Sequence, residues 1–294
     1  MASDQRLPIA VIGATGQQGR SVIDALLEQG VPVRAVVRNP DSPRARALRD
    51  AGAEVVTADQ EDEESLSAAL SNVAGLFFMT TFDGPDGTAG EVRRGRTVAE
   101  AAARAGVPHV VYSSVGGAER NTGIPHFDSK FEVEKRLTAL VPATILRPTF
   151  FMENLAEQLA PDGEGEIVIR MPMPGDVPVQ MVDVRDIGRA AARLLMEPGA
   201  HGDAIELAGD EPTLDRVAAQ AAEAFGLPAR FETIPLEYLG GDEDLKAMFR
   251  WFAGGSAYQA DLSRSRALVE GISDLPTWLI TQRGRVLAAG TEQG

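Results

Sequence analysis

The sequence has 294 residues, of which 44% are hydrophobic and 24% charged, a balance typical of globular proteins and not of disordered, collagenous or coiled-coil chains. The 28 Lys and Arg against 43 Asp and Glu give a net charge of −15, which disfavours direct binding to nucleic acids and to anionic membranes. The chain has no cysteine, which excludes disulfides, thiolate zinc ligands and a thiol nucleophile, and with only three histidines we expect no metal site.

Short apolar runs alternate with amphipathic segments over residues 7–147. The runs predict strands at 7–12, 33–37, 54–57, 75–79, 109–113 and 144–146. The segments between them predict helices at 17–29, 42–51, 63–71, 88–105 and 128–140, and Gly30, Gly52 and Gly106 fit the left-handed position that closes a helix. This alternation predicts an α/β fold with a doubly wound parallel sheet covered by helices on both faces.

The pattern loosens after residue 150. Residues 161–178 are rich in proline and glycine and predict a series of turns. Later segments predict helices at 183–196, 213–225, 242–253 and 277–282 and strands at 204–207 and 230–234. We therefore expect a nucleotide-binding domain over residues 1–150 and a smaller α/β C-terminal lobe over 151–294, partly interleaved with the first domain.

A glycine-rich turn joins the first predicted strand to the first predicted helix. It reads Gly13-Ala14-Thr15-Gly16-Gln17-Gln18-Gly19, a G-x-x-G-x-x-G pattern. In such a turn the first glycine allows a tight bend, the second lets backbone N–H groups approach a pyrophosphate, and the third lets the helix pack against the strand. The helix N-terminus adds partial positive charge, so the motif in this position predicts dinucleotide binding.

The ends of the next strands indicate which dinucleotide binds. The second strand is followed by Arg38 where NAD-specific proteins usually have an acidic residue, and a guanidinium suits a 2′-phosphate, so we expect NADP(H). Asp59, after the third strand, has two open interpretations: it contacts the adenine end, or it caps the next helix. Segment 81–90, after the fourth strand, contains three glycines and a proline and predicts a loop beside the ligand cleft.

Several motifs together resemble the NmrA-like family of atypical short-chain dehydrogenase/reductases, closest to the subgroup of NADPH-sensor proteins. The resemblance rests on the glycine turn, on Arg38-Asn39-Pro40, on His126-Phe127-Asp128-Ser129-Lys130 and on segments 147–154, 160–163, 175–178, 183–188 and 248–251. It extends over nearly the whole chain. It implies a Rossmann-like domain that binds NADP(H), a smaller lobe and a cleft between them.

The resemblance also implies a set of cofactor-binding residues. The pyrophosphate would be held by the glycine turn, the 2′-phosphate by Arg38, the adenine end by Asp59 and Gln60, and the nicotinamide ribose by Lys130. The full set is Gly13, Thr15, Gly16, Gln17, Gln18, Gly19, Arg38, Asp59, Gln60, Thr80, Thr81, Arg93, Lys130, Phe150, Phe151, Glu153 and Asn154. For Lys130 the alternative is a surface residue, and for Phe150 and Phe151 it is a place in the hydrophobic core.

The expected catalytic residues are Lys130 and His126. Typical short-chain dehydrogenases have a tyrosine four residues before the lysine, but this chain has His126 there. An imidazole with an ordinary pKa of about 6.5 could donate the proton, whereas the alternative is a loop histidine before the helix. Ser113 and Ser114 follow the fifth strand, in the region of the usual catalytic serine.

Two functions remain open at this stage. One is an NADPH-dependent reductase of a small electrophile such as a quinone, enone, imine or carbonyl compound, since hydride transfer needs mainly positioning and electrostatics. The other is a non-catalytic NADP(H) redox sensor that acts through a protein partner, and a homodimer is compatible with either. No secretory signal is readable before the first strand, so we expect a soluble, cytoplasmic protein.

Overall fold

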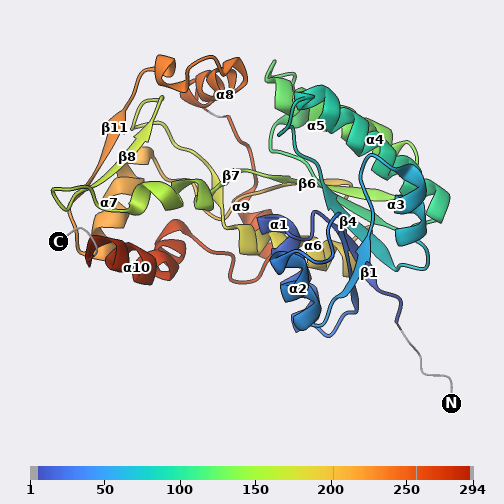
Figure 1. The fold of residues 1–294 in the computed structure, drawn as a ribbon. Helices are drawn as coiled ribbons and strands as arrows, with labels where there is room; N and C mark the ends of the chain where they lie inside the picture. Colours follow the sequence, from blue (N-terminus) through green and yellow to red (C-terminus); the bar gives the residue numbers. More distant parts are fainter. Residues whose placement is uncertain (1–5, 201, 256, 292–294) are drawn as a thin grey trace. The chain divides into compact units, whose positions relative to one another are not determined.

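The computed structural model describes residues 6–200, 202–255 and 257–291, which form two compact units (Figure 1). The first unit comprises the chain up to Asn121, then Pro125–Arg147 and Val184–Ile205. The second comprises Thr122–Ile124, Pro148–Asp183 and the chain from Glu206 onward. The chain therefore leaves the first unit and returns to it before completing the second.

The first unit is built on a sheet with the strand order β10-β6-β5-β4-β1-β2-β3. The strands are β1 (Ile9–Ile12), β2 (Val33–Val37), β3 (Glu54–Thr57), β4 (Gly75–Met79), β5 (Val110–Ser113), β6 (Ala143–Pro148) and β10 (Ala204–Leu207). The pairs from β3 through β6 are parallel. The strand order reverses between β1 and β4, and a parallel sheet binds ligands at the carboxyl ends of its strands at such a point. The predicted doubly wound, Rossmann-like fold is confirmed.

Helices cover both faces of this sheet (Figure 1). They are α1 (Gln17–Glu28), α2 (Pro43–Asp50), α3 (Glu63–Ala69), α4 (Gly87–Ala105), α5 (Pro125–Thr138) and α6 (Val184–Met196), with a 3-10 turn η1 (Ala118–Arg120). The apolar stripe of α1 is fully buried at Val22, Ile23 and Leu26 because it packs against the sheet and α6.

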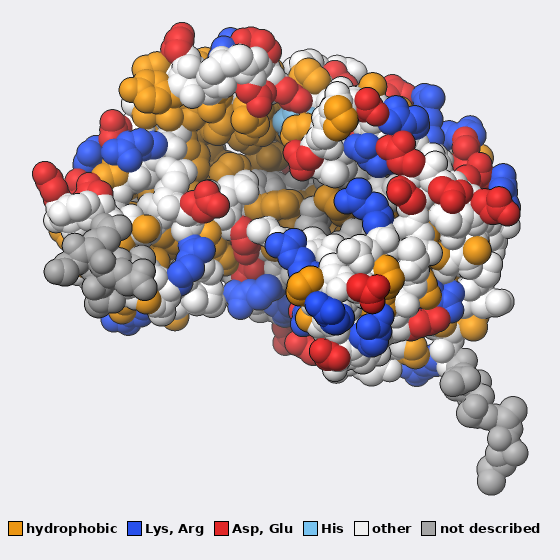
Figure 2. Space-filling view, viewed as in Figure 1, with side chains coloured by type: hydrophobic (Ala, Val, Ile, Leu, Met, Phe, Trp, Pro, Cys, Tyr) orange, Lys and Arg blue, Asp and Glu red, His pale blue; other side chains and the backbone are white. Residues whose placement is uncertain are grey.

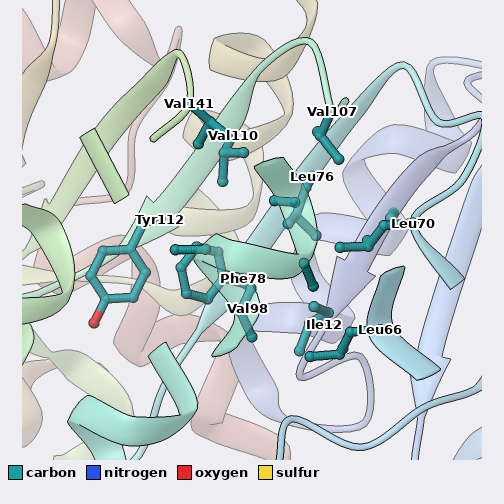
Figure 3. Close-up of a cluster of buried hydrophobic side chains, with 14 of the residues drawn as sticks. Ile12, Leu66, Leu70, Leu76, Phe78, Val98, Val107, Val110, Tyr112 and Val141 are labelled. Atoms are coloured by element: carbon teal, nitrogen blue, oxygen red, sulfur yellow. The ribbon is translucent and has the colours of Figure 1, made fainter. Parts of the chain in front are cut away.

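A single hydrophobic cluster joins α3, α4 and α5 to one face of the sheet (Figure 3). Phe78 of β4 and Tyr112 of β5 stack at its centre, with their ring centroids 4.6 Å apart. Leu66 from α3 and Val98 from α4 are also fully buried there. Helices cover both faces of the parallel sheet, so the side chains on both sides of its central strands are buried. These strands are rich in apolar residues for this reason.

The predicted helix ends agree with the structure. Gly30, Gly52 and Gly106 have φ values of +66°, +101° and +68°, the left-handed conformation expected directly after a helix. Asp62, not Asp59, is the N-cap of α3, and its carboxylate accepts hydrogen bonds from Glu64 N and Ser65 N. The interpretation of Asp59 as a helix cap is therefore wrong.

The second unit contains two small parallel ladders and a helical layer. The strands are β7 (Phe150–Phe151), which pairs with β9 (Met181–Val182), and β8 (Ile167–Met171), which pairs with β11 (Ala229–Thr233). The helices are α7 (Leu214–Phe225), α8 (Glu243–Ala253), α9 (Leu262–Leu268) and α10 (Leu275–Thr291), with 3-10 segments η2 (Met152–Leu159) and η3 (Leu236–Leu239). Its core includes a cluster of aromatic rings around the buried Phe252.

Three local expectations from the sequence differ from the structure. Strand β8 lies inside segment 161–178, where flanking prolines and glycines conceal a run of five residues. Helix α4 begins at Gly87, next to the predicted start at 88, so the last four residues of segment 81–90 are helical and not part of a loop. Burial of Gly90 and Glu91 outweighs the low helix propensity of glycine there. Helix α5 begins at Pro125 and includes His126, so this histidine is not a loop residue.

The packing of α4 on α5 generates a stability prediction. A Cβ at Gly95 would lie 2.3 Å from Cγ2 of Val133, so Gly95→Ala should overpack this contact and lower the free energy of unfolding by about 1–3 kcal/mol. Urea unfolding measures this loss, and adding Val133→Ala should recover part of it. Gly284→Ala in α10 is the control: nothing lies within 4 Å of its added Cβ, so it should stabilise by up to about 1 kcal/mol. Wild-type stability in Gly95→Ala would show that α4 and α5 have room for a methyl group at this contact.

Candidate functional site

The glycine turn forms a tight bend between β1 and α1. Gly13 has a φ of +81°, and its carbonyl accepts a hydrogen bond from Gly16 N at 3.0 Å. A Cβ at Gly19 would lie only 2.2 Å from the Gly13 carbonyl oxygen. Gly13 is therefore required by its backbone conformation and Gly19 by the close approach of α1 to β1.

Gly16 differs from the other two glycines of the motif. Its φ of −85° and ψ of 172° are open to any residue, and an added Cβ would lie 3.3 Å from the Gly13 carbonyl oxygen. It occupies the N-cap position of α1 and supplies no capping side chain. The first N–H groups of α1 thus remain available to an anion, and the first turn has no acidic residue to compete for them.

A cavity of about 600 Å³ opens beside this turn, entirely within the first unit. Its lining comes from the carboxyl ends of β1, β2 and β4, from the segments that follow β1 to β4, and from one residue each of α3 and α4. The strand order reverses between β1 and β4. The lining residues are Ile12, Gly13, Ala14, Thr15, Val36, Val37, Arg38, Ala58, Asp59, Gln60, Glu61, Leu66, Met79, Thr81, Asp83 and Arg94. The volume lies within the range of small-molecule sites.

The structure places six of the expected cofactor residues in this lining, namely Gly13, Thr15, Arg38, Asp59, Gln60 and Thr81. Arg38 is exposed, and no carboxylate of the described chain forms an ion pair with it. Its guanidinium is therefore available for a ligand phosphate. Gln17 is the exposed first residue of α1, and Gln18 accepts a 2.6 Å hydrogen bond from Ser113 Oγ, which ties the helix to the end of β5.

The basic residue of α4 in the cavity lining is Arg94, whereas the sequence pointed to Arg93. Arg93 is half-exposed and forms ion pairs with Asp86 at 2.5 Å and Glu61 at 3.4 Å, which raise its pKa further. Arg94 donates to the Thr81 carbonyl at 2.6 Å and pairs with Glu61 at 3.2 Å. Adjacent residues of a helix point in different directions, and which of the two arginines faces the cavity depends on how α4 packs on the sheet.

Lys130 lies in a buried polar cluster beside the end of β4. Its ammonium donates to Glu91 Oε1 at 2.5 Å and to the Thr80 carbonyl at 3.1 Å. The Thr80 hydroxyl in turn donates to Glu91 at 2.9 Å and lies 2.8 Å from the Tyr112 hydroxyl. The side chain of Lys130 is 12% exposed, so it is not a surface residue.

His126 lies one helical turn before Lys130 in α5 and is buried. Its ring stacks on Phe82 with centroids 4.9 Å apart and meets Phe127 edge-on at 4.8 Å. Phe82 belongs to the loop between β4 and α4, so this contact joins α5 to that loop.

The remaining expected residues belong to the second unit. Phe150 lies in β7 and packs in that unit's core, with its ring centroid 6.3 Å from that of Phe252. Phe151 is partly buried, Glu153 accepts a 3.1 Å hydrogen bond from Trp278 Nε1, and Asn154 is exposed. Their role toward a cofactor stays a prediction from the family resemblance.

The cavity and the turn fit a dinucleotide phosphate. The glycine bend leaves room where a side chain would otherwise stand, the first turn of α1 has no side-chain cap, and Arg38 has no carboxylate partner among the described residues. At the end of β5 the buried Ser114 hydroxyl has no hydrogen-bond partner in the described part of the chain. These features define a Rossmann-like dinucleotide-binding protein.

Comparison with known proteins identifies the family of this chain. The sequence profile of the NmrA-like family matches residues 5–277, and the chain belongs to this family. It is 31% identical to the NmrA-like family domain-containing oxidoreductase FrzB of Cladobotryum sp over 299 residues, 89% of each chain. It is 32% identical to the NAD(P)H azoreductase of Xenophilus azovorans over 234 residues, 78% of each chain.

A solved structure has a fold similar to that of this chain. The NADPH complex of the quinone oxidoreductase QOR2 from Escherichia coli has a TM-score of 0.77 and 28% identity, and the match covers 92% of this chain and 98% of that one. Over the described residues, no helix is long and apolar enough to cross a bilayer, and no group of three or more side chains could hold a metal ion.

Sequence reasoning did not identify Glu91, Tyr112 or Arg94 as part of the site. Glu91 and Tyr112 lie far from the glycine motif in the sequence, and only the packing of α4 and α5 on β4 and β5 brings them to Lys130. The sequence has one signal for Glu91: it is an acidic residue in the second turn of a helix whose other buried residues are small or apolar.

The buried tyrosine generates a prediction about alkaline stability. Burial, and secondarily the charge of Glu91, raises the pKa of Tyr112 well above its usual value, so the folded protein keeps this proton when the unfolded chain releases it above pH about 10. Stability should therefore fall as the pH rises above about 10. Tyr112→Phe should remove this contribution and cost about 0.5–1.5 kcal/mol at pH 7 through the lost hydrogen bond to Thr80.

Urea unfolding between pH 7 and 11 measures both effects. Tyr238→Phe is the control, because this side chain is 75% exposed, and it should keep the wild-type dependence on pH. The same alkaline loss in Tyr112→Phe as in the wild type would show that Tyr112 does not contribute to it.

Proposed function

We propose that this protein is an NADPH-dependent reductase of a small electrophilic substrate, such as a quinone, enone, imine or carbonyl compound. The observation that carries the proposal is the cavity at the reversal of strand order, lined by the glycine turn and by an arginine free for a 2′-phosphate. The azoreductase and quinone oxidoreductase names of two proteins similar to this chain support it.

The chain's own residues supply binding and positioning. The N–H groups at the start of α1 would hold the pyrophosphate, and Arg38 the 2′-phosphate, while Asp59 and Gln60 border the adenine end. Lys130, one turn after His126, would hold the nicotinamide ribose. Bound NADPH supplies a hydride, and the substrate takes up that hydride and one proton, which converts a quinone to a quinol or a carbonyl to an alcohol.

His126 is the chain's candidate for that proton. It occupies the position of the missing tyrosine, one turn from Lys130 on the same helix, and it is buried against Phe82. The same position also supports the alternative function, a non-catalytic NADP(H) sensor. The tyrosine that usually donates the proton is missing there, and a histidine replaces it.

One experiment separates the two functions. Loss of NADPH absorbance at 340 nm is followed with a panel of quinones and carbonyl compounds, while sedimentation reports oligomeric state with and without NADP⁺. Oxidation that depends on the protein supports the reductase. Tight binding without oxidation of NADPH by any acceptor, together with a change of assembly on binding, would favour the sensor.

The preference for NADPH over NADH depends on Arg38. Arg38→Ala should weaken NADPH binding by about 1.5–3 kcal/mol, the range for hydrogen bonds to charged groups, and leave NADH binding unchanged. Fluorescence titration with both cofactors measures this difference. Arg136→Ala is the control, because Arg136 pairs with Glu100 on the surface of α4 and α5. Identical titration curves of the wild type with NADPH and NADH would contradict the assignment.

The phosphate turn gives a second test. Gly16→Val should leave a folded protein, because the backbone there is extended, but abolish NADPH binding by filling the space of the pyrophosphate. Gly19→Val should instead prevent folding, since its Cβ would collide with the Gly13 carbonyl. Circular dichroism and NADPH titration separate these effects. A Gly16→Val protein that keeps its affinity would mean that the turn is only structural.

A further inference from the structure

A carboxylate with no exposure to solvent lies at the centre of the first unit's polar cluster. Glu91 belongs to the second turn of α4 and is 0% exposed. Three side chains donate hydrogen bonds to it: Thr80 Oγ1 at 2.9 Å, Ser129 Oγ at 2.5 Å and Lys130 Nζ at 2.5 Å. Both carboxylate oxygens thus accept hydrogen bonds, and the carboxylate cannot rotate without breaking these bonds.

Burial of this ion pair is expensive for the fold. The desolvation of two charges often exceeds their mutual attraction, so replacing such a pair with apolar side chains is frequently neutral or stabilising. The first unit already has a large apolar cluster around Phe78 and Tyr112, so the fold does not need Glu91 as a source of stability. A functional role in the candidate site explains the presence of this buried glutamate better than stability does.

The cluster fixes the ammonium of Lys130 in one place. One of its three N–H groups is used by Glu91 Oε1 and one by the Thr80 carbonyl, and within the described chain no further acceptor takes the third. Thr80 directly follows β4, between the cavity-lining residues Met79 and Thr81. The third N–H is therefore left for a group bound at the end of β4.

We infer that Glu91 is a positioning residue that holds Lys130 as a charged donor for the nicotinamide ribose. Tyr112 supports it from the other side: Thr80 gives its one hydroxyl proton to Glu91, so in the 2.8 Å contact the Tyr112 hydroxyl is the donor and Thr80 the acceptor. The inference rests on the proposed function, because it assigns Glu91 to the nicotinamide half of the same NADP(H) site.

The test compares two ligands on one variant. NADPH contains the nicotinamide ribose, whereas adenosine 2′,5′-bisphosphate contains the adenosine with its 2′- and 5′-phosphates and lacks the nicotinamide half. Glu91→Gln keeps the size of the side chain but removes the buried counter-charge of Lys130. It should weaken NADPH binding by about three- to tenfold and leave binding of the bisphosphate within a factor of two, because the displaced ammonium contacts only the nicotinamide half.

A matched control separates positioning from structural support. Glu134 is also buried, at 3% exposure, and pairs with Arg147 at 2.7 Å in the same unit. Glu134→Gln should lower stability as a broken buried ion pair does, but it should leave the ratio of the two affinities at the wild-type value. In a Lys130→Met background, Glu91→Gln should no longer change that ratio, since its effect passes through Lys130.

The outcomes separate this inference from the proposed function. Wild-type protein that binds neither NADPH nor the bisphosphate overturns both. Wild-type binding with equal losses for the two ligands in Glu91→Gln, or with no loss, overturns the inference and leaves the proposed function standing. If Glu91→Gln does not fold, Ser129→Ala removes one of the three donors without changing a charge, and an unchanged affinity ratio in that variant overturns the inference.

Discussion

The close approach of α1 to the end of β1 is the constraint on which the candidate site depends. The Gly13 carbonyl lies where any Cβ at Gly19 would be, so the helix can start directly beside the strand only with glycine there. This contact puts the uncapped N-terminus of α1 at the carboxyl ends of the strands. The reversal of strand order between β1 and β4 opens the cavity at the same place, so backbone geometry and topology bring the N–H groups of α1 and the cavity together.

Five polar side chains inside this apolar framework form one hydrogen-bonded group. They are Thr80, Glu91, Tyr112, Ser129 and Lys130, and only the Lys130 ammonium keeps an N–H group for a bound ligand, among the described residues. Such a network is rigid because loosening one member leaves another unsatisfied in a low-dielectric interior. Lys130 is held in this network by the Glu91 carboxylate and the Thr80 carbonyl.

The sequence predicted the fold of the first unit well, because strand periodicity, helix caps and the glycine turn are local signals. Gly30, Gly52 and Gly106 have the left-handed backbone that was expected of them. It did not predict β8, whose five residues are enclosed by prolines and glycines. In the site, the glycine motif and Arg38 could be found because they adjoin strands, whereas Glu91 depends on how α4 packs.

The central claim is that backbone N–H groups of the glycine turn hold the pyrophosphate. Amide NMR of ¹⁵N-labelled protein titrated with NADP⁺ tests it directly, because a phosphate that accepts a hydrogen bond shifts the donating amide strongly. The account predicts saturable shifts that are largest at Thr15, Gly16, Gln17 and Gln18. Saturable binding with those four amides unmoved, and the largest shifts in the second unit, would contradict it.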